Sequence, residues 1–321
     1  MRKARCIVFV LLFCLLLQLT GCAAAQKPLR VTLVLKTVTE VAEFWGTLLS
    51  GVEKAAEEYG VELKVLTSPR EIDIDKQIEL IRQVTEEKPD VMILSAADYD
   101  RCAEATEEAI AAGIGVVAVD TDVNAEGRAC FVGSNNYQIG QEMGSQMASY
   151  LPEGGKVAVI QHMLTTTTGI DRTRGVIDAL TQAGNIEILG SYCCDNSTLR
   201  AKEITTALLE DEPDIRGFVC TNEVCNVGAA NALVELGMGG KVFVVGCDNS
   251  QRQIALLEQN IIQAIVIQRP FNMGYMSVQQ AVRVAQGEKP EDFVEVACVL
   301  ITRENMYTQE NQKLLFPVME Q

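Results

Sequence analysis

Seven residues of this chain have the side-chain types that recognise a hydroxyl-rich ring. They are two neighbouring aromatic residues and five planar polar residues: Phe44, Trp45, Asp120, Arg172, Asn222, Asp248 and Gln268. A sugar hydroxyl costs about 1–3 kcal/mol if it is buried without a partner, and carboxylate, carboxamide and guanidinium groups can each bond two adjacent hydroxyls. An aromatic ring can cover the apolar C–H face. The set therefore predicts reversible binding of a monosaccharide or a related polyol.

Each of these residues also has a purely structural interpretation. Asp120 and Asp248 are suited to helix N-caps or turns, and Arg172 to the exposed side of a helix. Phe44 and Trp45 could fill a core, and the two carboxamides could satisfy loop backbone. The joint occurrence of all seven, rather than any one of them, favours a binding site.

Catalytic and metal-binding constellations are missing from the sequence. His162 is the only histidine, which leaves no Ser/His/Asp or Cys/His set and no histidine cluster for zinc. Neither GxxxxGK[ST] nor GxGxxG occurs. Asp120 and Asp248 remain a conceivable acid/base pair of the glycosidase type. We nevertheless expect no enzyme, no cofactor and no metal.

Alternating strands and helices must position these residues. The first series comprises strands and helices expected at 29–35, 43–59, 61–66, 74–85, 91–95, 101–112 and 115–119. The second comprises elements expected at 137–151, 156–160, 172–183, 186–189, 199–209, 215–220, 224–236, 241–246, 251–259 and 262–267. Such alternation predicts two α/β lobes, each a doubly wound parallel sheet. A helix over 274–286 and a strand over 293–301 have no lobe assignment from periodicity.

Ligands of open α/β sheets bind outside the carboxyl ends of the strands. All seven residues lie in segments that follow expected strands, so we expect them to converge in a cleft between the lobes.

The first 22 residues read MRKARCIVFVLLFCLLLQLTGC and predict a secretory signal over residues 1–21. The apolar run is shorter than the roughly 20 residues of a membrane-spanning helix. Its end, Leu-Thr-Gly-Cys, resembles a bacterial lipobox, which would make Cys22 the lipidated N-terminus and residues 22–28 a tether. The alternative is an ordinary signal peptide with a coincidental cysteine. We expect an extracytoplasmic protein, anchored to the cell membrane by lipid.

The amino-acid composition limits the classes of partner that the protein can bind. With 27 Lys and Arg against 43 Asp and Glu, the formal net charge is −16, which would repel nucleic acid. Eight of the eleven cysteines remain once the signal and Cys22 are set aside. Outside the cytoplasm they could form disulfides, but their irregular spacing leaves the connectivity open.

The chain resembles the periplasmic sugar-binding proteins related to the ribose-binding protein of ABC importers, which share their fold with the ligand domains of LacI-type repressors. The resemblance covers nearly the whole chain after the signal. It is carried, in order, by Glu43-Phe44-Trp45, Val117-Ala118-Val119-Asp120, the segment 132–140, Asp171-Arg172-Thr173-Arg174-Gly175, Thr221-Asn222-Glu223, the segment 244–248 and the segment 268–274.

This resemblance implies a hinge of three crossings, near Ser134, Gln268 and Cys298. The N-lobe would then be residues 28–134 plus 269–298, and the C-lobe residues 135–268 plus 299–321. It further implies that the two aromatic residues sandwich or cap the sugar ring while the five polar residues bind hydroxyls. The implied partner is an ABC permease, and a sensory protein presenting its ligand to a chemoreceptor or histidine kinase is the alternative.

Three positions depart from the ribose-binding pattern. Ala42, Thr121 and Asn196 stand where asparagine, arginine and an aromatic residue are expected. These differences argue against ribose, and the indole of Trp45 suits a pyranose or another polyol. An inositol or a furanone-type signalling molecule is a further alternative.

Overall fold

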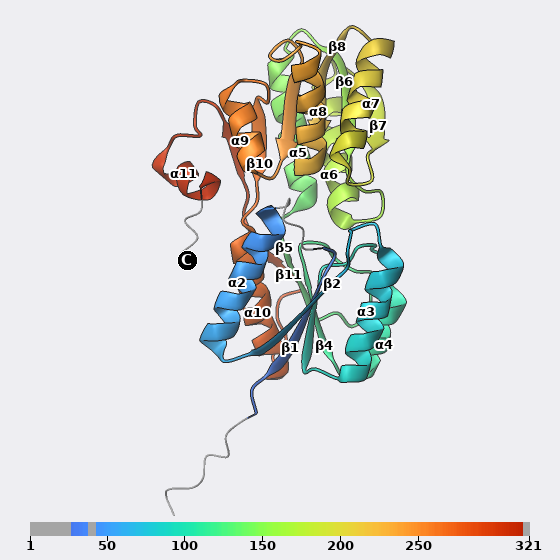
Figure 1. Cartoon of the computed structure of the whole chain (residues 1–321), viewed down its shortest axis with the longest axis vertical. Coiled ribbons are helices and arrows are strands. Elements are labelled where there is room, and N and C mark those ends of the chain that lie inside the picture. Colours follow the sequence, from blue (N-terminus) through green and yellow to red (C-terminus); the bar gives the residue numbers. More distant parts are fainter. Residues whose placement is uncertain (1–26, 38–42, 317–321) are drawn as a thin grey trace, which may run out of the picture.

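The computed structural model describes residues 27–37 and 43–316 and shows two α/β lobes, one above the other (Figure 1). The expected signal at 1–21 and Cys22 lie outside the described residues. In the part of the chain that the structure describes, no helix has the length and apolar character needed to cross a membrane.

The N-terminal lobe contains one parallel sheet in the order β11-β5-β4-β3-β1-β2. Its strands are β1 (Arg30–Leu35), β2 (Glu62–Thr67), β3 (Val91–Leu94), β4 (Gly115–Val119), β5 (Cys130–Gly133) and β11 (Phe293–Glu295). Its helices are α2 (Glu43–Tyr59), α3 (Ile74–Glu87), α4 (Ala103–Ala111) and α10 (Pro270–Ala285). Side chains of α2 and α10 form the core on one face of this sheet, and those of α3 and α4 on the other.

The C-terminal lobe repeats this plan with the order β12-β10-β9-β8-β6-β7. Its strands are β6 (Gly155–Gln161), β7 (Ile186–Cys193), β8 (Ile215–Cys220), β9 (Phe243–Cys247), β10 (Ala264–Ile267) and the antiparallel β12 (Val299–Thr302). Its helices are α5 (Asn136–Tyr150), α6 (Thr167–Ala183), α7 (Thr198–Asp211), α8 (Glu223–Glu235), α9 (Gln251–Glu258) and α11 (Gln309–Leu315). The predicted fold class, two doubly wound α/β lobes, is confirmed.

The chain passes between the two sheets three times. It leaves the first sheet after β5, returns to the first lobe after β10, and crosses again between β11 and β12. Two of the crossing segments are hydrogen-bonded, because Ser134 Oγ donates to Val296 O at 2.9 Å and Val296 N donates to Gly133 O at 2.8 Å.

Two expectations about elements were wrong, and one strand was missed. The expected single strand over 293–301 is two strands in different sheets, because the chain crosses between lobes at 296–298. Helix α6 begins at Thr167 rather than at Arg172, since the Thr166 hydroxyl caps it by accepting from Gly169 N at 3.2 Å. Strand β5, which is four residues long, was not among the expected elements.

Glycines set the closest approach of the helix pairs that border the cleft. A Cβ on Gly274 of α10 would lie 2.0 Å from the carbonyl oxygen of Leu48 on α2. In the other lobe, a Cβ on Gly140 of α5 would lie 2.1 Å from the carbonyl oxygen of Arg172 on α6. These distances are far inside van der Waals contact, so each pair can pack this closely only without a side chain there.

We therefore expect Gly274→Ala to lower the free energy of unfolding by at least about 2 kcal/mol, because the new methyl group must push α10 away from α2. The matched control is Gly46→Ala on α2, where an added Cβ meets nothing within 4 Å. That variant should be neutral or gain up to about 1 kcal/mol from helix propensity. Urea unfolding followed by circular dichroism measures both, and equal midpoints for the two variants would contradict this account of the packing.

Candidate functional site

A cavity of about 460 Å³, counted together with the solvent at its mouth, lies between the lobes at the carboxyl ends of the strands. Its lining comprises Lys36, Phe44, Trp45, Glu71, Asp120, His162, Thr168, Arg172, Asn196, Asn222, Glu223, Val224, Asp248 and Gln268. The structure thus brings all seven residues singled out from the sequence around one cavity.

Two aspartates occupy equivalent places in the two lobes. Asp120 follows β4 with φ 62°, and Asp248 follows β9 with φ 67°. Their backbone N–H groups donate to the next strand of each sheet, at Val132 O (3.0 Å) and Val266 O (2.8 Å). Neither aspartate caps a helix, since Asn135 and Ser250 cap the helices that follow. The left-handed backbone, which costs about 1 kcal/mol or more for a non-glycine residue, instead turns each carboxylate into the cavity.

Arg172 is held in one orientation by the C-terminal lobe. It is only 2% exposed, so the interpretation as a surface arginine was wrong. Its Nε donates to Asn136 Oδ1 and its Nη1 to Thr221 O, both at 2.9 Å. Nη1 also lies 3.7 Å from Asp248 Oδ2. A guanidinium fixed at two of its nitrogens presents its remaining donors in a fixed direction.

Gln268 and Asn222 are likewise fixed by neighbouring polar groups. Gln268 Nε2 donates to Asp248 Oδ1 at 2.6 Å. Asn222 is the N-cap of α8, where its Oδ1 accepts from Cys225 N at 3.0 Å, while its Nδ2 donates to Asn196 Oδ1 at 2.9 Å. The structural interpretation therefore applies to Asn222 without removing it from the cavity.

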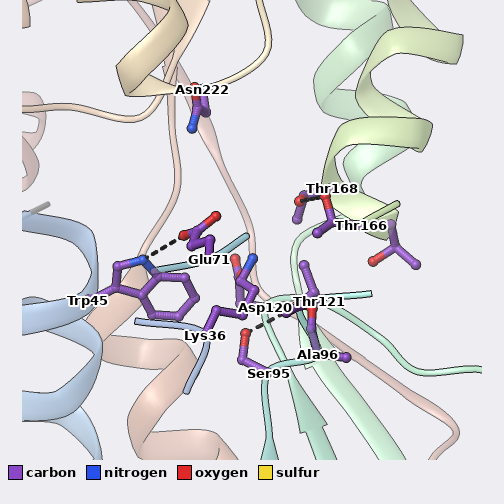
Figure 2. Close-up of polar contacts among 12 residues, drawn as sticks. Lys36, Trp45, Glu71, Ser95, Ala96, Asp120, Thr121, Thr166, Thr168 and Asn222 are labelled. Carbon is purple, nitrogen blue, oxygen red and sulfur yellow. Dashed lines mark hydrogen bonds and ion pairs between the residues drawn. The ribbon is translucent and has the colours of Figure 1, made fainter. Parts of the chain in front are cut away.

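Trp45 is held at the N-terminal side of the cavity by a carboxylate that the sequence analysis did not single out. Its Nε1 donates to Glu71 Oε1 at 3.1 Å, and Figure 2 shows the indole with its N–H directed at Glu71. The ring of Phe44 meets it edge-on at 5.1 Å. Lys36 Nζ lies 5.1 Å from the ring centroid and 3.4 Å from Asp120 Oδ2. Trp45 also packs in the lobe core, so the core interpretation is correct for part of its ring.

The remaining lining residues were missed for identifiable reasons. Lys36 and His162 directly follow β1 and β6, so the strand-end rule pointed to their segments but not to these side chains. Glu71 lies on the loop after the edge strand β2, a segment the rule did not include. Asn196, which replaces the expected aromatic residue, does line the cavity.

Burial controls the protonation of the site. It raises the pKa of Asp120, and the nearby Lys36 and Arg172 partly oppose this shift. It also lowers the pKa of His162 well below the ordinary value, so the imidazole is neutral near pH 7. The two ring nitrogens lie at 2.8 Å from Thr221 Oγ1 and 3.1 Å from Thr168 Oγ1. Lys36 lies beside Asp120 and Arg172 beside Asp248, so each aspartate has a cation as a neighbour, which suits a neutral, hydroxyl-rich molecule.

Metal ligation was not expected, and the residues described contain no cluster of three His, Cys, Asp or Glu side chains able to hold an ion.

Comparison with known proteins identifies the family. A model of the periplasmic binding protein domain matches residues 32–289. The chain belongs to this family. The D-allose-binding periplasmic protein of Escherichia coli K12 is 25% identical over 303 residues, covering 90% of this chain and 96% of that protein.

Two crystal structures show the same fold. A sugar transporter from Clostridium phytofermentans is 31% identical, with a TM-score of 0.78, and the match covers 85% of this chain and 98% of that one. A carbohydrate transporter solute-binding protein from Agrobacterium radiobacter, in complex with D-arabinose, has a TM-score of 0.86 at 23% identity over 91% and 100% of the chains. The relatives are named as binding or transport proteins, which confirms the expectation that the chain is a binding protein and not an enzyme.

The Glu71 hydrogen bond predicts how the indole behaves in solution. Trp45 is the only tryptophan, so intrinsic tryptophan fluorescence reports on this site alone. We expect Glu71→Ala to increase quenching by acrylamide, because it removes the acceptor and opens the edge of the indole. Glu71→Gln keeps an acceptor oxygen and should behave as the wild type. Equal quenching in all three proteins would show that Glu71 does not hold the ring.

The raised pKa of Glu223 leads us to expect that the stability of the folded protein depends on pH. Burial, with a smaller contribution from Asp248, raises its pKa to about 7. The folded protein therefore binds this proton more tightly than the unfolded chain, and stability falls as pH rises from about 4.5 to 7. Glu223→Gln should remove this loss, which amounts to roughly 1–2 kcal/mol once partial solvent exposure is allowed for.

Urea unfolding at a series of pH values tests this dependence. The control is Glu235→Gln, at the exposed far end of the same helix, which should keep the wild-type profile. Parallel profiles for wild type and Glu223→Gln would refute the assignment.

Proposed function

We propose that the protein is the extracytoplasmic, lipid-anchored solute-binding component of an ABC importer, and that it captures a monosaccharide or related polyol by closure of its two lobes. The observation that carries this proposal is the convergence of Phe44, Trp45, Asp120, Arg172, Asn222, Asp248 and Gln268 on one cavity between the lobes. Membership of the periplasmic binding protein family supports it.

Hydrogen bonds between the lobes support a closing motion. Tyr99 N donates to Thr165 O at 2.9 Å, Asp122 N to Thr167 Oγ1 at 3.1 Å, and Gln251 N to Glu43 Oε1 at 3.3 Å. These three hydrogen bonds join the two lobes in a closed form. A ligand that touches both lobes binds this closed form more tightly and so shifts the population toward it.

The three crossings suit a hinge. We propose that residues 28–134 plus 269–298 move as one body and residues 135–268 plus 299–321 as the other, with the adjacent crossings at Ser134 and Val296 held together by their hydrogen bonds. Rotation about a few such residues opens and closes the cleft without disturbing either core.

The lining favours a neutral ring with one broad apolar face. Trp45 offers an indole surface, and both aspartates are already countered by cations, so a ligand need not carry charge to satisfy them. Relatives named for D-allose and D-arabinose are in keeping with a pyranose or another polyol.

Replacing Asp120 tests the binding site. A thermal-shift screen with D-allose, D-ribose, D-arabinose, D-fucose and myo-inositol first selects the ligand, which at 100 times its dissociation constant should stabilise the protein by about 2.7 kcal/mol. For the selected compound, Asp120→Asn should raise the dissociation constant at least about tenfold, since a charge-assisted hydrogen bond is lost. Calorimetry measures both proteins.

The control for this experiment is Asp90→Asn. Asp90 lies at the opposite end of the same sheet, where its Oδ2 accepts from Arg30 N at 2.8 Å. It should bind as the wild type does. Unchanged affinity in Asp120→Asn would defeat the assignment of the site, and chemical conversion of the sugar during long incubation would defeat a purely binding function.

Lipid attachment at Cys22 predicts partition behaviour. Expressed in a bacterial host, the wild-type protein should enter the detergent-rich phase of Triton X-114, because more than one acyl chain gives stable membrane association. Cys22→Ser should remain in the aqueous phase. Recovery of the wild-type protein in the aqueous phase would refute the lipid anchor.

Crosslinking in intact membranes identifies the partner protein. Recovery of a histidine kinase or chemoreceptor instead of a permease would assign the protein to sensing.

A further inference from the structure

Two buried thiols of the C-terminal lobe are in direct contact. The Sγ atoms of Cys194 and Cys225 lie 3.4 Å apart, and neither residue is exposed to solvent. Cys194 directly follows β7, and Cys225 lies in the first turn of α8. Among the cysteines that the structure describes, these two are the only pair whose sulfur atoms are hydrogen-bonded to each other.

We propose that Cys194 and Cys225 are a disulfide-forming site, which a small or protein-borne disulfide oxidises outside the cytoplasm. Only the compartment rests on the proposed function, since the contact itself does not depend on any ligand. Closing the bond requires the two sulfur atoms to approach from 3.4 Å to about 2.0 Å.

The reaction is a thiol–disulfide exchange. The Cys194 thiolate attacks one sulfur of the oxidant disulfide and forms a mixed disulfide, releasing one thiol. The Cys225 thiolate then attacks Cys194 Sγ, forms the internal bond and releases the second thiol. Two protein thiols are oxidised, one oxidant disulfide is reduced to two thiols, and the two protons of the protein thiols pass to the released thiolates.

The environments of the two thiols fit this order of attack. The hydrogen bond from Cys225 lowers the pKa of the Cys194 thiol. Burial raises the pKa of the Cys225 thiol well above its usual value. Cys194 is therefore the thiol that ionises first, and an ionised thiol is the nucleophile.

The loop that follows Cys194 gives an oxidant access through local opening. Asp195 and Asn196 both adopt left-handed backbone, with φ 50° and 52°, a conformation costing about 1 kcal/mol or more for each non-glycine residue. The proposal requires this loop to open transiently, because Cys194 and Cys225 are both buried.

A disulfide here would clamp one wall of the cavity. Asn196 lies two residues after Cys194, and Asn222 three residues before Cys225, and the two asparagines are hydrogen-bonded to each other at 2.9 Å in the cavity lining. The covalent bond would lie directly behind this contact and hold the loop against the start of α8.

Peptide mapping tests the pairing. Purified full-length protein is equilibrated in a buffer of reduced and oxidised glutathione, alkylated under denaturing conditions and digested. We expect a crosslinked peptide containing Cys194 and Cys225 that carries two hydrogens fewer than the two free peptides together. Because Cys193 lies on the same peptide, the Cys193→Ser variant is the matched control and should retain the crosslink. A crosslink that requires Cys193, or the absence of any crosslink to Cys225, would overturn the proposal.

Stability and exchange provide independent readouts. The oxidised wild type should melt roughly 5 °C above the protein reduced with dithiothreitol, because the bond closes a loop of the unfolded chain. Hydrogen exchange over residues 194–198 should slow on oxidation. Both differences should vanish in Cys225→Ala and persist in Cys193→Ser, and the opposite pattern would contradict the site. If Cys225→Ala does not fold, peptide mapping of the wild type and Cys193→Ser with cleavage after Glu223, which separates Cys220 from Cys225, still gives the answer. None of these measurements uses a sugar, so failure of the ligand assignment is distinguishable from failure of this one.

Discussion

The cavity depends on burying two carboxylates at strand ends without leaving either charge uncompensated. Asp120 and Asp248 are nearly inaccessible to solvent, and an unpaired carboxylate there would cost several kcal/mol. Lys36 reaches Asp120 within its own lobe, and Arg172 and Gln268 reach Asp248. Each set of partners lies within a single lobe, so opening of the cleft leaves them intact, and the polar side chains of the site are preorganised rather than assembled by the ligand.

The positions of the site residues could be predicted because the fold class fixes where a ligand meets an open parallel sheet. The alternation of strands and helices could be recognised in the sequence, and the segments after the strands contained the seven residues that were singled out, all of which line the cavity. Contacts that depend on the direction of a side chain could not be predicted from the sequence. The approach of Glu71 to Trp45 joins a loop after an edge strand to a helix 26 residues earlier, and no spacing rule connects them.

From periodicity alone, the chain crossings were harder to predict than the strands. The 293–301 segment has one continuous strand-like pattern. It nevertheless contributes one strand to each of the two sheets, because tertiary structure decides where a strand stops. The burial of Arg172 could not be predicted from the sequence either. Its residue type favours the surface, and only the partners Asn136, Thr221 and Asp248, each distant in sequence, make burial of a guanidinium tolerable.

The order of segments along the chain has a consequence for how the protein is made. Helix α10 and strand β11 complete the first lobe, yet they follow nearly the whole of the second. Synthesis proceeds from the N-terminus. The core of the first lobe is therefore incomplete until Met273 and Val278 have been synthesised, because these residues pack against β1 and α2. Residues 136–267, in contrast, are contiguous and contain most of the second lobe. The second lobe can therefore reach a compact state first, and the first lobe remains exposed to chaperones and proteases for longer although its chain emerges earlier.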